Sequence, residues 1–158
     1  MLTTTRRQLR AYVFAEIGEE DRPDFESAMI RIPLRGRNRG LTPAYRCSNW
    51  VGCEVLPFPL TEEPHPVLTE PFSFLDIGPT GQFVLFGELN RPLTPTEHAG
   101  LIDGTKRIYV FGEIRYRDAF TIWRGRRQNR YTKFRYMVAV VDGHPRGLMA
   151  CPEGNRAN

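Results

Sequence analysis

The stretch that most constrains the fold is residues 106–118, KRIYVFGEIRYRD, whose side chains alternate between two faces. One face carries mostly apolar residues: Ile108, Val110, Gly112, Ile114 and Tyr116. The other face is mixed: Arg107, Tyr109, Phe111, Glu113, Arg115 and Arg117. Only an extended chain sends successive side chains to opposite sides, so this period of two predicts a β-strand. We expect a central strand here, paired with a second strand at residues 131–141.

The rest of the chain reads as short strands separated by turns. Strand patterns occur at residues 9–17, 25–34, 45–56, 72–77 and 82–89, and 14 glycines and 13 prolines among 158 residues fit many tight turns. These features predict an all-β fold, a two-layer antiparallel β-sandwich of the immunoglobulin-like type with about seven strands. We expect a polar segment at residues 1–8, the sandwich domain at 9–141, and a mobile C-terminal tail at 142–158.

One short helix is predicted near residues 94–103. Thr94 suits the N-cap and Pro95 the first helical position. Glu97, three residues after Thr94, completes a capping box, and Gly104 can end the helix. Three apolar residues predict a narrow stripe that packs across an end of the sheet as a crossover: Ala99, Leu101 and Ile102.

Two connecting segments have distinctive compositions. Residues 57–71 contain five prolines, which deny backbone donors to a sheet, so we expect a connecting arm. The RGRNRG segment at residues 35–40 resembles a phosphate-contacting loop, but no helix N-terminus follows it, and an exposed loop is the favoured interpretation.

Targeting and redox features favour a cytoplasmic protein. No run approaches the roughly 18 apolar residues of a membrane-spanning helix, and the N-terminus lacks the apolar core of a secretory signal. The three cysteines, Cys47, Cys53 and Cys151, have no CxxC spacing and are expected to be free thiols. A translation start upstream of Met1 would instead allow membrane association.

Catalytic chemistry is poorly represented. The three histidines are scattered, so neither a nucleophilic triad nor a metal site is expected. A carboxylate pair of Glu88 and Glu113 would require their strands to be neighbours. Phosphate-cradling glycine loops are absent, and no cofactor is predicted. We therefore expect the protein not to be an enzyme.

The feature that most favours a binding function is a basic and aromatic hairpin at residues 123–135. Residues 104–158 carry 12 basic and 4 acidic side chains, whereas residues 1–103 carry 10 basic and 14 acidic ones. Charges interleaved with rings suit anionic surfaces. The candidate partner-binding residues are Trp123, Arg124, Arg126, Arg127, Arg130, Tyr131, Lys133 and Arg135. The hairpin can instead be a solvated loop without a partner. If it binds, the possible partners are an anionic membrane surface, an acidic protein or nucleic acid. The acidic protein can be another copy of this chain, through residues 19–24, and no recognised nucleic-acid-binding signature is present.

Several phrases resemble a known group of proteins. They are TRRQLRAYVF, NRGLTPAY, EVLPFPL, RPLTPTEHAGLIDGTKRIYVFGEIRYRDAF and RYTKFR, spread over about residues 4–137. Together they resemble uncharacterised small bacterial proteins in which an N-terminal membrane helix and a helical stalk precede a β-sandwich. The resemblance implies the sandwich and implies no activity. This chain departs from the pattern because it lacks the membrane helix and has a longer, more basic hairpin.

The sequence thus predicts a non-catalytic interaction module with a protein partner. The alternative is an anionic-surface binder, for lipid or nucleic acid, that uses the 123–135 hairpin. An apolar protein interface would instead centre on Trp50 or Phe111 and would be less sensitive to salt. The partner's identity and the oligomeric state do not follow from the sequence.

Overall fold

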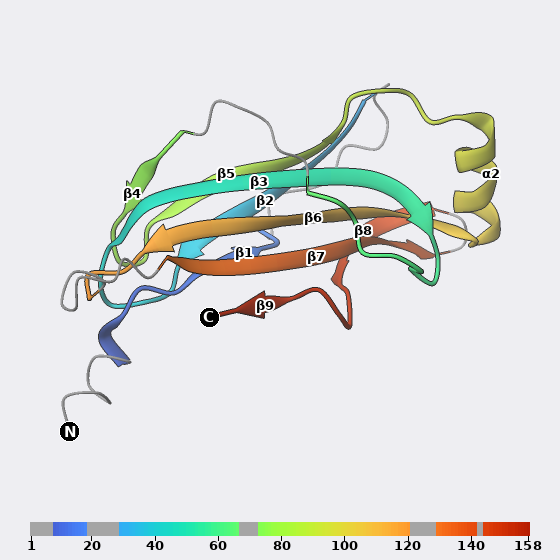
Figure 1. The fold of residues 1–158 in the computed structure, drawn as a ribbon. Helices are drawn as coiled ribbons and strands as arrows, with labels where there is room; N and C mark the ends of the chain where they lie inside the picture. The colour runs from blue at the N-terminus through green and yellow to red at the C-terminus, as the bar shows by residue number, and fades with distance from the viewer. Residues whose placement is uncertain (1–7, 19–28, 67–72, 121–128, 142–143) are drawn as a thin grey trace.

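The structure is a computed structural model that describes residues 8–18, 29–66, 73–120, 129–141 and 144–158. This part of the chain is mostly β and contains nine strands and the helix α2 (Figure 1). The strands are β1 (Val13–Glu16), β2 (Ile30–Asn38), β3 (Ala44–Pro57), β4 (Leu75–Ile77), β5 (Gln82–Leu89), β6 (Lys106–Arg117), β7 (Arg130–Val141), β8 (His144–Ala150) and β9 (Arg156–Ala157).

The strands form two antiparallel sheets. The smaller sheet has the order β1-β2-β5, and the larger has the order β4-β3-β6-β7-β8, with β9 added beside β7. The predicted central strand is confirmed, since β6 lies between β3 and β7 and pairs with both. Its pairing with the 131–141 segment is also confirmed, because Gly112 lies opposite Phe134.

The main core lies between the two sheets. Alternate residues of β2 and β6 point into it, because an extended strand with one apolar face buries every second side chain. Its members come from both sheets and include Val13, Ile32, Leu34, Leu85, Val110, Ile114, Phe134 and Val138. Strand β7 contributes Phe134 and Val138 to this core, and they are 3% and 1% exposed.

A second, smaller apolar cluster covers the other face of the larger sheet. Tyr109, Phe111 and Cys151 are buried there, and Trp50 and Leu60 pack against them. Leu60 belongs to the proline-rich arm, so the described part of that arm, residues 58–66, crosses the sheet as a strap. This cover explains why both faces of β6 carry apolar residues.

Helix α2 (Pro95–Asp103) has the predicted ends. Thr94 and Glu97 form the capping box, and Gly104 closes the helix with a left-handed φ of 85°. Of the predicted apolar stripe only Leu101 packs against the core, because Ala99 is exposed and Ile102 is 61% exposed. The buried residues of the helix are Glu97 and Gly100, the latter packed against the Lys106 side chain on β6.

The C-terminal segment differs from the predicted mobile tail. Residues 144–150 form β8 along β7, and β9 places Arg156 opposite Lys133. The side chain of Asn155 supports this arrangement, since Arg135 donates its backbone N–H to Asn155 Oδ1 at 2.9 Å. A sequence rich in glycine and proline gives no strong strand pattern, and the long β7 strand supplies the pairing that orders it.

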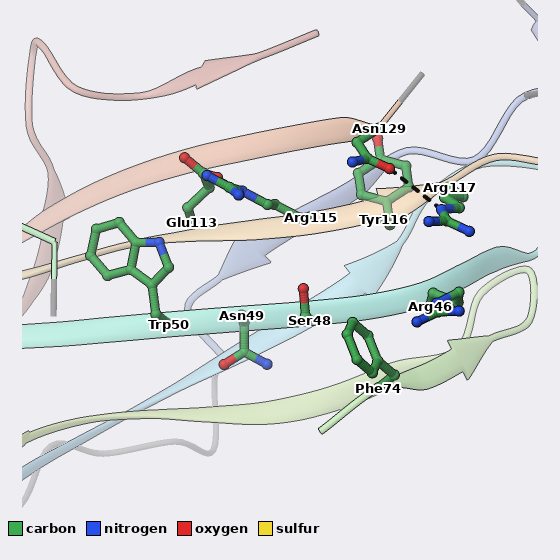
Figure 2. A pocket seen from close by; sticks show the side chains of 10 residues that line it. All are labelled: Arg46, Ser48, Asn49, Trp50, Phe74, Glu113, Arg115, Tyr116, Arg117 and Asn129. Atoms are coloured by element: carbon green, nitrogen blue, oxygen red, sulfur yellow. Dashed lines mark hydrogen bonds and ion pairs between the residues drawn. The ribbon is translucent and has the colours of Figure 1, made fainter. Parts of the chain in front are cut away.

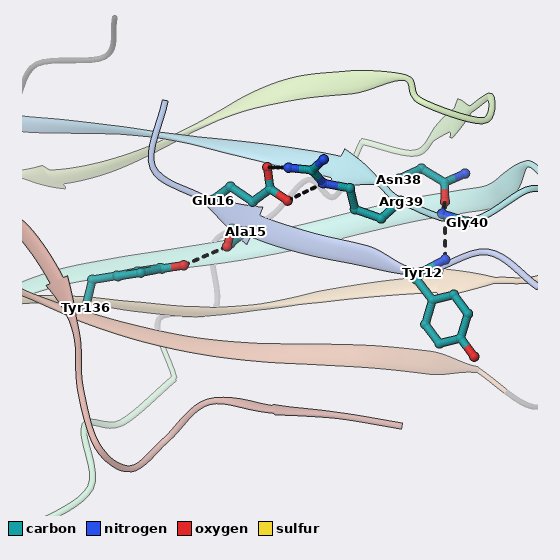
Figure 3. Close-up of polar contacts among 7 residues, drawn as sticks. All are labelled: Tyr12, Ala15, Glu16, Asn38, Arg39, Gly40 and Tyr136. Carbon is teal, nitrogen blue, oxygen red and sulfur yellow. Dashed lines mark hydrogen bonds and ion pairs between the residues drawn. The ribbon is translucent and has the colours of Figure 1, made fainter. Parts of the chain in front are cut away.

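The RGRNRG segment is a strand end rather than the expected exposed loop. Residues 35–38 complete β2, and Asn38 is fully buried. Asn38 Oδ1 accepts the backbone N–H groups of Tyr12, at 3.2 Å, and Gly40, at 2.9 Å (Figure 3). Its Nδ2 donates to the carbonyls of Thr42, Ile77 and Gly78. This one side chain therefore joins segments from both sheets.

Candidate binding site on the outer face of the larger sheet

Strand alternation divides the predicted hairpin residues between two faces. Tyr131, Lys133 and Arg135 lie opposite Arg115, Glu113 and Phe111 in the β6–β7 register, so they share the outer face of the larger sheet. Arg130 alternates to the other side. The remaining four candidates, Trp123, Arg124, Arg126 and Arg127, lie outside the described residues.

Arg130 has a structural partner. Its Nε lies 3.0 Å from Oδ2 of Asp118, a carboxylate that is 97% buried at its side chain. Asp118 Oδ1 also accepts the backbone N–H of Phe120 at 3.0 Å. The ion pair therefore fixes the end of β6 against the start of β7, so the Arg130 guanidinium has a structural role.

Arg135 is held beneath two segments. It is only 9% exposed, and its Nη2 lies 3.4 Å from Oε1 of Glu63 in the strap. Gly154, with φ of 88°, crosses the guanidinium so closely that a Cβ there would lie 2.5 Å from Arg135 Cζ. Only glycine fits this crossing. Arg135 thus supports the strap and the C-terminal turn.

A cavity of about 320 Å³ opens on the same outer face, toward the β4 edge (Figure 2). It brings together basic and aromatic side chains from β3, β6 and the segment before β4. Its principal residues are Arg46, Trp50, Phe74, Glu113, Arg115 and Arg117. Four of these belong to no site hypothesis made from the sequence: Arg46, Phe74, Arg115 and Arg117.

A β-bulge positions Arg46. Tyr45 pairs with Arg117 and Ser48 with Arg115, so three steps along β3 match two along β6. The extra residue places Arg46 in the left-handed region, with φ of 48°, which is costly for a side chain other than glycine. The guanidinium of Arg46 then lies over the Phe74 ring, 4.7 Å from its centroid.

The cavity has an excess of positive charge. Glu113, which is 6% exposed, is its only carboxylate among the described lining residues, and it bonds to Nε of Arg115. Arg117 Nε donates to Asn129 Oδ1 at 3.4 Å, a neutral partner. Among the described residues, no carboxylate pairs with the guanidinium of Arg46 or of Arg117, and the nearby Asp76 accepts the backbone N–H of Arg46 instead. Two guanidinium groups therefore line the cavity with no ion-pair partner among the described residues.

Trp50 links this cavity to a larger hollow beneath the strap. Its ring meets Phe111 edge to face, with centroids 6.2 Å apart and planes at 73°. Phe111, Pro64, Pro66 and Lys133 line the second hollow, of about 540 Å³, together with Trp50. The half-buried indole thus both packs on the sheet and borders two adjoining cavities.

The other carboxylate and thiol groups considered for catalysis lie outside this cavity or are unreactive. Glu88 lies on β5 and pairs with Arg31 at 3.0 Å, so it is not a neighbour of Glu113. Burial raises the pKa of the Cys47 and Cys53 thiols to about 12, which leaves both protonated at neutral pH.

The described ranges contain no group of His, Cys, Asp and Glu suited to a metal ion. No helix in them has the length and apolar character of a membrane span.

Comparison with known proteins adds no family. No family model, curated protein or solved structure matches this chain. What the site can do therefore follows from its geometry: it offers guanidinium donors beside aromatic rings on a rigid sheet. Sequence alternation alone places Arg115 and Arg117 on the same face as Glu113. It could not have placed Arg46, whose direction depends on the bulge.

Proposed function

We propose that this protein is a non-catalytic interaction module that binds an acidic peptide segment of a partner protein on the outer face of its larger sheet. One observation carries the proposal: the guanidiniums of Arg46 and Arg117 line one cavity with Trp50 and Phe74, and neither is paired with a carboxylate among the described residues. We include in the proposal the immunoglobulin-like sandwich architecture, in which two facing sheets provide a rigid support for these side chains.

A carboxylate is the group that best fits the cavity. Guanidinium groups bind carboxylates through planar, charge-assisted hydrogen bonds, and such contacts fix orientation as well as charge. An acidic residue of a peptide could bind both Arg46 and Arg117.

The aromatic residues suit the remainder of such a peptide. Trp50 and Phe74 offer apolar surface next to the charged groups, and Phe74 is 56% exposed. Tryptophan and arginine are the residue types most enriched among the energetic centres of protein interfaces. The adjoining hollow beneath Pro64 and Pro66 gives an extended segment room to continue across the sheet.

Selection from a random peptide library displayed on phage tests this proposal. Peptides retained by the wild-type protein should be enriched in Asp or Glu next to an apolar residue. A synthetic selected peptide should then bind at least about tenfold more weakly, by titration calorimetry, to Arg46→Glu/Arg117→Glu, because two attractive charges become repulsive.

The matched control is Arg35→Glu/Arg37→Glu, which makes the same charge change on the smaller sheet. It should leave peptide affinity within about twofold, since the two surfaces are separate and salt screens distant charges. The proposal fails if selected peptides lack acidic residues, or if both double variants lower affinity equally.

A further inference from the structure

A second charged surface lies on the outer face of the smaller sheet. Strand β2 carries Arg31, Arg35 and Arg37 at alternate positions, so these side chains project to the side opposite the core residues Ile32 and Leu34. Arg39 follows directly and forms a two-point ion pair with Glu16 of β1, at 2.6 and 2.8 Å (Figure 3). Arg35 and Arg37 are about 6.6 Å apart along the strand, and Arg31 lies about 13 Å before Arg35, with Pro33 between them.

Exposed apolar side chains adjoin this arginine row. In the β2–β5 register, Arg35 lies opposite Val84 and Pro33 lies opposite Phe86. Val84 is 51% exposed and Phe86 is 40% exposed. Met29, immediately before β2, is 57% exposed. Positive charge and solvent-exposed apolar surface thus occupy the same face.

Among the described side chains of this face, positive charges outnumber negative ones. Four arginines, at 31, 35, 37 and 39, stand against two glutamates, Glu16 and Glu88. Glu88 pairs with Arg31 and Glu16 with Arg39. Arg37 contacts no carboxylate among the described residues, and the net charge of the six side chains is +2.

We propose that the outer face of the β1-β2-β5 sheet docks on an anionic phospholipid bilayer. The arginines would contact lipid phosphates and serine carboxylates, while Val84 and Phe86 enter the interfacial region. Arginine suits this position because its apolar stem can lie along hydrocarbon while the guanidinium stays among the headgroups. This surface is distinct from the peptide-binding cavity, which lies on the other sheet.

The aromatic geometry favours a bilayer over a single-stranded nucleic acid. Nucleic-acid sheets use open ring faces on which bases stack. Here the Arg31 guanidinium lies over the Phe86 ring, 3.7 Å from its centroid, and Arg10 lies over Tyr12 at 4.4 Å. One face of each ring is therefore already occupied. Exposed aliphatic groups such as Val84 serve no stacking role, whereas they can insert between lipid headgroups.

Vesicle sedimentation with the full chain tests the proposal. Wild-type protein should sediment with vesicles of phosphatidylserine and phosphatidylcholine, but not of phosphatidylcholine alone, at about 0.1 M salt. Arg35→Glu/Arg37→Glu should lose at least about tenfold in vesicle affinity, because four units of charge change at the membrane surface. Arg46→Glu/Arg117→Glu, with the same charge change on the other sheet, should stay within about twofold of wild type.

A second variant keeps the test decisive if the first does not fold. Val84→Trp places a fluorophore on the exposed face, and its emission should shift to shorter wavelength with phosphatidylserine vesicles, beyond any shift of the wild-type tryptophans. Absence of phosphatidylserine-dependent sedimentation by wild type overturns the proposal. So does an equal loss in both double variants, or binding to a single-stranded oligonucleotide without binding to vesicles.

Discussion

The backbone N–H of Arg46 donates a 2.8 Å hydrogen bond to Oδ1 of Asp76. The bulge in β3 takes this N–H out of the regular ladder, and the carboxylate on β4 replaces the missing acceptor. The strained φ of Arg46 is thereby held by a neighbouring strand. A residue kept in an unfavourable conformation next to a cavity suggests a role in that cavity.

Replacing Arg46 with asparagine should separate binding from stability. Asparagine tolerates the left-handed region, so its relief of strain offsets the lost stacking on Phe74, and unfolding free energy should change by less than about 1 kcal/mol. Peptide affinity should nevertheless fall at least about fivefold, because a guanidinium is lost. Urea unfolding and calorimetry measure the two effects. A destabilisation above about 2 kcal/mol would show that Arg46 is primarily structural.

Asn38→Ala should be severely destabilising. The substitution leaves two buried N–H groups and up to three carbonyls without their partner, and we expect a loss of about 3 kcal/mol in urea unfolding. Asn90 is exposed, so Asn90→Ala is a suitable control and should change stability by less than about 0.5 kcal/mol. Similar losses in the two variants would mean that the Asn38 hydrogen bonds contribute little.

Glu97 should make the stability depend on pH in acid. Its hydrogen bonds to Arg91, and secondarily to Thr94, lower the pKa of the carboxyl to about 2, against burial, which raises it. Since the folded pKa lies below the ordinary value of 4.5, its stabilisation is present above about pH 5 and is lost as pH falls toward 2. Glu97→Gln should remove about 1–2 kcal/mol at pH 7 and flatten this part of the profile. Parallel stability profiles for wild type and variant would contradict this role.

Thr80→Gly should stabilise the β4–β5 turn. Gly81 donates its N–H to the Gly78 carbonyl at 3.0 Å, and Thr80 has φ of 63° at the third turn position, where glycine is favoured. Relief of this strain, less the greater chain entropy of glycine, should add about 0.5–1 kcal/mol. The same change at Thr96, inside α2, should instead cost a few tenths of a kcal/mol. Urea midpoints of the two variants should move in opposite directions.

The elements predicted best were those whose signal is local. The β6 pattern depends on the alternation of adjacent residues, and the ends of α2 depend on Thr94, Glu97 and Gly104 within one short segment. The prediction that Ile102 is buried was wrong because the helical spacing of apolar residues carries no information about tertiary contacts. Two such contacts are the Arg91–Glu97 ion pair and the packing of Gly100 against Lys106. Those contacts decide which side of the helix is buried.

The sequence pattern predicts only part of the candidate site. The basic and aromatic composition of residues 123–135 predicted a binding site there. In the structure Arg130 forms an ion pair with Asp118, and strand alternation places Tyr131, Lys133 and Arg135 on the outer face. Arg46 and Arg117 line the same cavity because β3 and β6 are neighbours in space, although 71 positions separate the two residues in the chain. Proximity of that kind follows from strand register and not from composition.

The sequence by itself determined the β-rich class, the central strand with its neighbour β7, and a capped helix, because these follow from interactions among residues close in the chain. Only the tertiary structure decided that residues 144–157 add strands to β7, that Asn38 joins the two sheets, and that a bulge places the Arg46 guanidinium over Phe74. Each of these depends on partners distant in sequence. Their hydrogen bonds and burial form only when the sheets assemble.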